Sequence, residues 1–183
     1  MTFDPDGASL LPGRKVLTSM GIEHDYAISI AVQSDGKLVV TGYAFNGSNY
    51  DFALARYTAN GALDPSFGNG GKVISPIGSY NNFARSMALQ SDGKIVLAGY
   101  ASTANGDDFA LARYTTDGVL APTFGCDGKV ISHLGSFEDA AYCIAIQSDG
   151  KIVVAGQRRN AARRRRHSAR GPCFVVRRKR AQC

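Results

Sequence analysis

Short apolar runs alternate along most of this chain with clusters of glycine, asparagine, aspartate and serine. In the clearest stretch the apolar runs occupy Lys72–Ile77, Ala84–Gln90, Lys94–Ala101 and Asp108–Thr115. Runs of this length, rich in Val, Ile, Phe and Tyr and bounded by turn residues, are typical of β-strands. No window before residue 157 keeps the i, i+3, i+4, i+7 apolar spacing of a surface helix. The pattern therefore predicts an all-β chain.

The polar stretch Gln-Ser-Asp-Gly-Lys separates two of these runs and occurs three times. It begins at Gln33, Gln90 and Gln147, so that successive copies are 57 residues apart. Ser-Asp-Gly between two apolar runs predicts a tight hairpin, because such a turn needs residues that tolerate positive φ. A fixed period of this kind indicates an internally repeated architecture.

Two further motifs share the period and complete the repeat unit. Asp-Phe-Ala-Leu-Ala-Arg-Tyr-Thr occupies 51–58 and 108–115, and Gly-Lys-Val-Ile-Ser occupies 71–75 and 128–132. Residues Lys15–Leu17 are a degenerate earlier copy of the second motif. Each unit is thus predicted to hold four strands, and the strand that contains Lys-Val-Ile is placed first in its unit.

The apolar pattern inside the strands predicts how the sheets pack. Ile95–Ala98 and Ile152–Ala155 are continuous apolar runs without the polar alternate of a half-solvated strand. Sheets of such strands are covered on both faces. Four-stranded sheets that recur and are sandwiched by their neighbours are typical of β-propeller blades. We therefore predict a partial β-propeller of about three four-stranded antiparallel blades, with an open solenoid-like stack as the alternative.

The number of blades predicts incomplete coverage. Residues 8–156 hold eleven predicted strands, which form part of one unit, two joined units and an unfinished third. Closed propellers typically use four to eight blades, so three are too few to close a ring. We therefore expect uncovered blade faces and unpaired strand edges. The chain is then either a fragment of a longer array or completes itself by self-association.

The segment 157–183 breaks the repeat. From residue 158 onward it holds ten Arg, one Lys and no acidic residue, so the rest of the chain carries ten basic residues against fifteen acidic ones. The formal net charge of +6 therefore comes from this tail alone. The repeat also predicts a strand near residues 165–172, and the arginine-rich sequence there does not resemble one.

Two interpretations of the tail follow. Clustered arginine neutralises phosphates and binds them in a salt-dependent way, so the tail could bind nucleic acid or another acidic surface. Alternatively, the tail is not a selected continuation of the repeat and is disordered or translated out of frame. The predicted organisation is therefore 1–156 as an incomplete array of repeats and 157–183 as an arginine-rich tail.

Three motifs together resemble the bacterial delta-60 repeat family. They are Ser-Asp-Gly-Lys-Ile-Val followed by Leu or Val and Ala-Gly at 91–99 and 148–156, Asp-Phe-Ala-Leu-Ala-Arg-Tyr at 51–57 and 108–114, and Leu-Asp-Pro-Ser-Phe-Gly-Asn-Gly-Gly-Lys-Val at 63–73. The resemblance covers roughly residues 10–156. It implies a β-propeller module found in tandem in large bacterial proteins that are often secreted or surface-associated. It implies no catalytic residues.

The repeated aspartates Asp35, Asp92 and Asp149 are the first candidates for chemistry. They could bind Ca²⁺ together with loop oxygens, for which Asn105, Asp107 and Asp108 are available. A calcium loop needs several oxygen ligands at alternating spacing, whereas Ser-Asp-Gly-Lys offers one carboxylate beside a lysine. We therefore interpret these aspartates as residues that the hairpin turn requires.

Arg56 and Arg113 share a strand face with apolar residues and recur with the blade. A ligand site would not be expected to repeat in this way. We expect each arginine to pair with an aspartate of a neighbouring loop and to pack its aliphatic stem on the core.

The remaining candidate residues show no pattern of a site. His24, His133 and His167 have no spacing to cysteines or acids that would suggest zinc. The four cysteines, Cys126, Cys143, Cys173 and Cys183, allow three pairings, none of which the sequence favours.

The functional expectation follows from these absences. No residue is assigned a catalytic, cofactor-binding or metal-binding role, no stretch is long and apolar enough to span a bilayer, and Met1–Gly7 does not resemble a secretory signal. We therefore expect a non-catalytic structural or binding module, with an unidentified protein or glycan as its partner. The alternative is nucleic-acid or acidic-surface binding through the tail.

Overall fold

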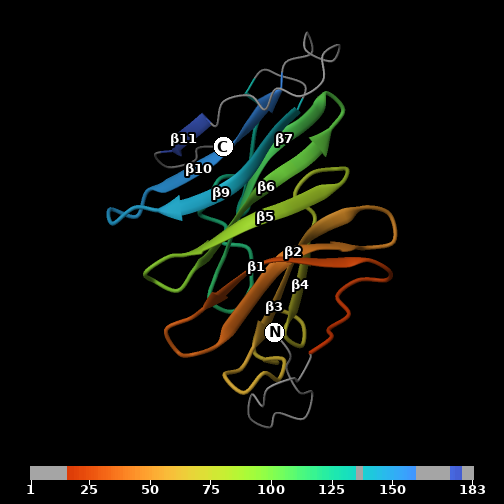
Figure 1. Ribbon diagram of the computed structural model, residues 1–183, viewed down its shortest axis with the longest axis vertical. Coiled ribbons are helices and arrows are strands. Elements are labelled where there is room, and N and C mark those ends of the chain that lie inside the picture. Colours follow the sequence, from red (N-terminus) through yellow and green to blue (C-terminus); the bar gives the residue numbers. More distant parts are fainter. Residues whose placement is uncertain (1–15, 135–137, 160–173, 179–183) are drawn as a thin grey trace.

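The computed structural model describes residues 16–134, 138–159 and 174–178 (Figure 1). Every regular element among these residues is a β-strand, as the apolar pattern predicts. Within the same residues, no helix is long and apolar enough to cross a membrane. The sheets follow one another along the longest axis of the molecule, from the N-terminal sheet to the C-terminal one.

The first sheet contains four antiparallel strands in chain order. They are β1 (Asp25–Val32), β2 (Leu38–Phe45), β3 (Tyr50–Tyr57) and β4 (Lys72–Ser75). The second group repeats this order with β5 (Asn82–Leu89), β6 (Ile95–Thr103), β7 (Gly106–Tyr114) and β8 (Lys129–Ser132). The strand positions agree closely with those that the repeat predicts.

The third group contains β9 (Glu138–Ile146), β10 (Ile152–Arg159) and β11 (Phe174–Arg178), all antiparallel. A single parallel pair, Asp107 with Glu138, joins β9 to β7 and links the second and third groups. Strand β11 lies in the arginine-rich tail, where the sequence predicts no strand of the repeat. The predicted strand position at 165–172 and most of the tail lie outside the described residues.

Two sequence predictions about strand grouping are wrong. The run Lys72–Ser75 was placed first in the second unit, but it pairs with β3 and is the last strand of the first sheet. Likewise, Val16 and Leu17 were expected to form a strand, but they lie outside any strand. The reason is the same in both cases. The Lys-Val-Ile strand pairs with the long strand that precedes it, and no such strand precedes Val16 among the described residues.

A bulge near the middle of the first strand of each group shapes the second strand opposite. In β5 the ladder skips Arg85, between Ala84 and Ser86, and the bulged backbone approaches β6 closely. A Cβ atom at Gly99 of β6 would lie 1.9 Å from the carbonyl oxygen of Phe83. The close approach of the two strands therefore requires glycine at position 99, the final residue of the Ser-Asp-Gly-Lys-Ile-Val-Leu-Ala-Gly motif at 91–99.

The core lies between successive sheets. We call the side of each sheet that faces the next group its forward face and the opposite side its rear face. On the forward face of the first sheet, Val39, Phe52 and Leu54 are fully buried. They pack in one cluster with rear-face residues of the second group, including Ile95 and Leu97. Burial of these side chains provides the main stabilisation between blades.

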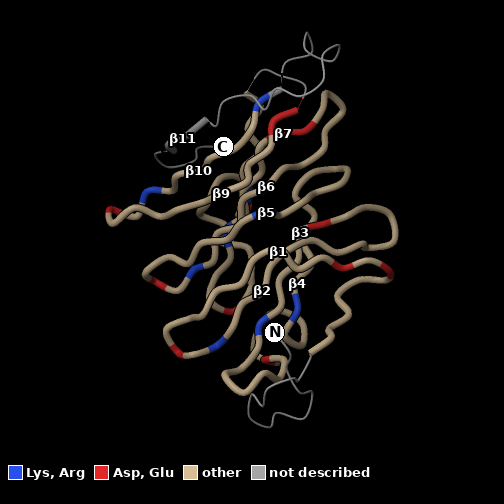
Figure 2. The backbone as a smooth tube through the Cα atoms, viewed as in Figure 1, with Lys and Arg blue, Asp and Glu red and all other residues tan. Residues whose placement is uncertain are grey.

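A second cluster repeats the arrangement one boundary later. Forward-face residues Phe109 and Leu111 pack with Ala141 and Val154 of the third group. Charged residues occur mainly in hairpins and at strand ends, and the middles of the strands hold few of them (Figure 2). The three groups are therefore successive blades of one kind.

Candidate functional site

Aromatic side chains gather across the boundary between the first two blades. We call Tyr26, Tyr43, Tyr50, Phe83 and Tyr100 the aromatic cluster. Tyr26 stacks on Tyr43 with ring centroids 4.8 Å apart. Phe83 of the second blade lies 4.9 Å from Tyr43 and 5.0 Å from Tyr100, so its ring joins the rings of the two blades. Aromatic pairs at these separations attract each other beyond simple burial of area.

Arg85 lies at the centre of this cluster. Its guanidinium carbon is 5.6 Å from the ring centroid of Tyr43, 5.8 Å from that of Phe83 and 5.4 Å from that of Tyr100. Its Nη2 atom donates a hydrogen bond of 3.0 Å to the hydroxyl of Tyr100. A cation over several ring faces is stabilised by their quadrupoles. The rings therefore hold the guanidinium in place at a partly exposed position.

The sequence analysis did not identify Arg85, because it is the bulged residue of β5. The equivalent residues in β1 and β9 are Ile28 and Tyr142, so the position belongs to no repeated motif. The sequence marks Arg85 as unusual only through this difference in residue type between equivalent positions of the three blades. Bulges re-aim side chains and are frequent next to binding sites.

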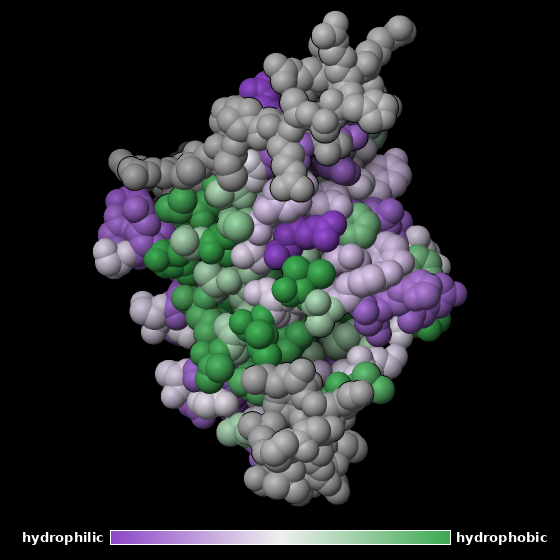
Figure 3. Space-filling view, viewed as in Figure 1, coloured by the Kyte–Doolittle hydropathy of each residue, from purple (hydrophilic) through white to green (hydrophobic). Residues whose placement is uncertain are grey.

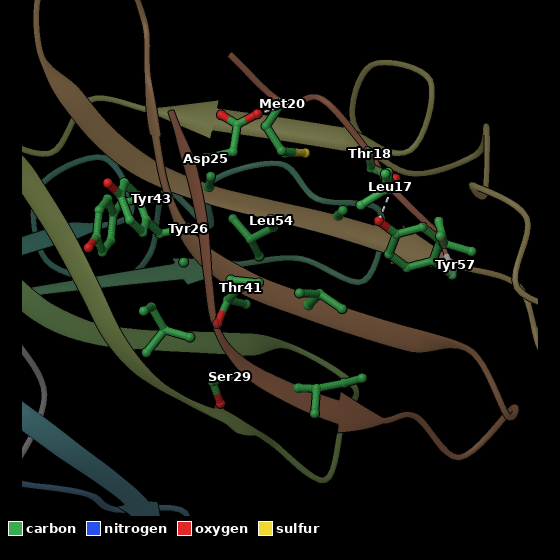
Figure 4. A pocket seen from close by; sticks show the side chains of 18 residues that line it. Leu17, Thr18, Met20, Asp25, Tyr26, Ser29, Thr41, Tyr43, Leu54 and Tyr57 are labelled. Carbon is green, nitrogen blue, oxygen red and sulfur yellow. Dashed lines mark hydrogen bonds between the residues drawn. The ribbon is translucent and has the colours of Figure 1, made fainter. Parts of the chain in front are cut away.

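A cavity of about 440 Å³ lies beside this cluster, over the rear face of the first sheet (Figure 4). Its lining comes from β1, β2 and β3 and from the segment before β1, and includes Leu17, Met20, Ile30, Val40 and Tyr57. Tyr26 and Tyr43 line one side of it. The cavity is mainly apolar.

Arg56 has the structural role that the sequence predicts. Its Nε atom donates to a carboxylate oxygen of Asp64 at 2.9 Å, and its guanidinium carbon lies 4.6 Å from the ring centroid of Phe67. Nη2 donates to the hydroxyl of Ser66 at 3.0 Å, and Nη1 donates to the carbonyl of Thr116 in the next blade. This prediction is confirmed.

Electrostatics around Asp64 favour its ionised form. Burial by itself would raise the pKa of Asp64, but hydrogen bonds from Ser66 and Lys37 and the charge of Arg56 outweigh burial. The pKa of Asp64 is therefore held well below its usual range. This ion pair fixes the loop after β3.

Arg113, the equivalent of Arg56 in the second blade, keeps the contacts with an aromatic ring and a hydroxyl but has no equivalent of Asp64. Its guanidinium carbon lies 4.7 Å from the ring centroid of Phe124 and its Nη2 atom donates to Thr123 at 3.0 Å. The position equivalent to Asp64 is Ala121, so the aspartate that the sequence analysis expected is absent. Burial lowers the pKa of Arg113, and the charge of Asp92 opposes that effect only in part. The expectation of packing is confirmed, and that of a loop aspartate is wrong.

The repeated aspartates serve their turns. In each Ser-Asp-Gly-Lys hairpin the backbone amide of the lysine donates to the aspartate carboxylate, at 3.1 Å for Asp35, 3.2 Å for Asp92 and 3.1 Å for Asp149. The calcium alternative is not supported for Asp92, because Asp107 and Asp108 lie at the opposite end of the β6–β7 ladder. The structural interpretation of these residues is confirmed.

The structure does bring one histidine to acidic residues. Nδ1 of His133 lies 2.7 Å from a carboxylate oxygen of Asp108, and Asp139 completes a group whose ligand atoms lie within 4.8 Å of one another. The sequence analysis missed this group because Asp108 lies 25 residues before His133, in another strand, and reaches it only through the fold. Its signal is a change between repeats, since the equivalents of His133 and Asp139 are Pro76 and Asn82.

Other candidates remain apart from any site. His24 precedes β1, and His167 lies outside the described residues. Cys126 and Cys143 are exposed free thiols, and Cys173 and Cys183 also lie outside the described residues.

Comparison with known families agrees with this architecture. A family model described as a domain of unknown function (DUF5122) beta-propeller matches residues 33–67, 90–124 and 147–166. None of the curated proteins matches the chain. Each match begins at the glutamine that opens the repeated hairpin, so the matched segments keep the 57-residue spacing. The recurring sheets and these three matches support a β-propeller fold built from repeats.

Proposed function

We propose that this chain is a non-catalytic β-propeller repeat module that binds a protein partner through the aromatic cluster and Arg85. The observation that carries the proposal is the partly exposed guanidinium held among rings from two blades. Tyrosine and arginine dominate the binding energy of protein interfaces, where they form rigid anchors of large area. Aromatic residues and arginine are also enriched in interfaces relative to the rest of the surface.

The position of the cluster supports this role. Figure 3 shows apolar side chains on the face that carries β1, β5 and β9, and the cluster includes Tyr26 of β1 and Phe83 of β5. Tyr26 is 45% exposed, so a partner can contact its ring without rearrangement of the core. The rings already fix the guanidinium, so binding would cost little side-chain entropy. A partner that presents a carboxylate to Arg85 and an apolar side chain to Tyr26 fits this surface best.

The experiment uses the full chain and a phage library of random peptides. We expect the selected peptides to be enriched in Asp or Glu next to an aromatic or aliphatic residue. The matched variant is Arg85→Ile, because Ile28 occupies the same bulge in the first blade. This variant should retain the selected peptides at least about tenfold more weakly, because one charged contact is worth more than 1.4 kcal/mol.

Two outcomes would contradict the proposal. If the wild-type protein and Arg85→Ile retain the selected peptides equally, Arg85 is not part of the binding site. No enriched peptide, together with binding to a glycan array that is lost in Tyr26→Ala, would instead identify a glycan as the ligand. Circular dichroism of both variants checks that the β-sheet content is unchanged.

A further inference from the structure

The rear face of the first sheet repeats a surface that is covered elsewhere in the molecule. The residues that line its cavity include Ile30, Val40, Ala55 and Tyr57. Their equivalents, 57 residues later, are Met87, Leu97, Ala112 and Tyr114, which all pack in the core between the first two blades. The second blade therefore packs this pattern of side chains into the core, whereas in the first blade Ala55 and Tyr57 are buried and Ile30 remains half exposed.

The open face exposes large apolar side chains. Ile30 is 51% exposed and Val32 is 65% exposed, and Leu17 beside them is 93% exposed. Exposed apolar side chains that are contiguous on one surface mark sites of association. Burying them against a partner would remove apolar surface from water, which favours association.

The opposite end of the array carries the complementary surface. On the forward face of the third blade, Cys143 and Ala145 are exposed small residues. Their equivalents in β5 are Ser86 and Ala88, which lie on the forward face of the second blade. The third blade thus presents the first-strand part of a forward face, whereas the large apolar residues that cover a rear face at the two boundaries inside the chain include Phe52 and Leu54 of β3 and Phe109 and Leu111 of β7.

We propose that two copies of this chain associate head to tail, with the forward face of the third blade of each copy covering the rear face of the first blade of the other. Such a contact is heterologous and closes when its rotation completes a ring. Two chains of three blades supply six, which lies within the four to eight blades of closed propellers. Each interface of the ring would then place the first strand of one blade beside the first strand of the next, as β5 lies beside β9 within the chain.

The first test is sedimentation velocity of the full chain over a wide concentration range. We expect a concentration-dependent dimer that Ile30→Asp and Ala145→Asp each weaken at least about tenfold, because each places a carboxylate in an apolar contact. The matched control is Val119→Asp, which changes another exposed apolar residue, in the β7–β8 connection, and should leave the dimer unchanged. A monomer at every concentration, or a dimer insensitive to Ile30→Asp, would overturn the proposal.

A mixing experiment separates head-to-tail association from other modes. In a mixture of the Ile30→Asp and Ala145→Asp proteins, one of the two ring interfaces combines an unaltered rear face with an unaltered forward face. The mixture should therefore form more dimer than either variant alone. A symmetric contact between two rear faces would be weakened by Ile30→Asp and unaffected by Ala145→Asp, and that result would contradict the ring.

Discussion

The side-chain amide of Asn82 donates a hydrogen bond of 2.9 Å to the carboxylate of Asp51, across the boundary between the first two blades. Both residues are almost completely buried. Asn82 also accepts a bond of 2.8 Å from the backbone amide of Gly78 and donates one of 2.7 Å to the carbonyl of Tyr80. One amide therefore connects the preceding blade with the loop that leads into β5, and its neutral charge leaves Asp51 as the single carboxylate of the pair.

The next boundary has a second carboxylate in this place. Asp139 replaces Asn82, Asp108 replaces Asp51, and His133 replaces Pro76. His133 contacts Asp108 directly, so its imidazolium offsets part of the repulsion between the two acids when it is protonated. Equivalent positions thus hold one carboxylate and an amide at the first boundary, and two carboxylates and a histidine at the second.

The first prediction places the charged residues of the second boundary at the equivalent positions of the first boundary. Asn82→Asp should destabilise the protein by about 2 kcal/mol at pH 7, because it places a second buried carboxylate beside Asp51 without a cation. The double variant Asn82→Asp with Pro76→His should regain part of that loss at pH 6, where more of the histidine is protonated. Urea unfolding at both pH values measures the effect. An equal loss in the single and double variants at pH 6 would show that charge does not explain the difference between the boundaries.

The second prediction concerns the ion pair between Arg56 and Asp64. Both side chains are nearly buried, and Lys37 also lies 3.0 Å from the same carboxylate oxygen. Asp64→Asn should therefore destabilise the protein by about 3 kcal/mol, because it leaves a buried guanidinium without its counter-charge. Asp35→Asn is the control, since Asp35 is an exposed partner of the same lysine and should contribute about 0.5 kcal/mol or less. Similar losses in both variants would contradict this argument.

The third prediction is the pH dependence of that pair. The pKa of Asp64 is lower in the folded protein than its unfolded-state value, which is about 3.9. Its contribution is therefore complete above pH 4 to 5 and is lost as the pH falls toward the folded-state pKa. The difference in unfolding free energy between wild type and Asp64→Asn should shrink steadily from pH 5 to pH 2. A difference that stays constant over this range would show that the ionised form of Asp64 is not what stabilises the loop.

The strands were predictable from the sequence because each is a short apolar run between obligatory turn residues. Their grouping was not, because Lys72–Ser75 is apolar on the same pattern whether it pairs with the preceding or the following strand. Only the register with β3 decides that question, and it depends on the long loop that returns the chain. The turn role of Asp92 was predictable, since the turn is local and its hydrogen bond spans two residues.

The aromatic cluster could not be predicted, since its members come from two blades. Tyr43 and Phe83 are far apart in the chain and meet only because the second blade packs on the first. Arg85 occupies a bulge, and the bulge shifts its side chain away from the alternation that strand patterns assume. Residues that differ between repeats, such as Arg85 and His133, hold the information that the repeated motifs do not.

The last prediction tests the bulge through the glycine opposite it. Gly99→Ala should destabilise the protein by at least about 3 kcal/mol, because the new methyl group would lie 1.9 Å from the carbonyl oxygen of Phe83 and backbone must move to admit it. Gly70→Ala is the matched control, since Gly70 has a φ of 58° but open space around it. The unfolding free energy of that variant should fall by only about 1 kcal/mol, which is the conformational cost of an alanine in the left-handed region. Thermal and urea unfolding of both proteins compare the two costs. If Gly99→Ala loses no more stability than Gly70→Ala, the close approach of β5 to β6 is not what fixes glycine in the repeat.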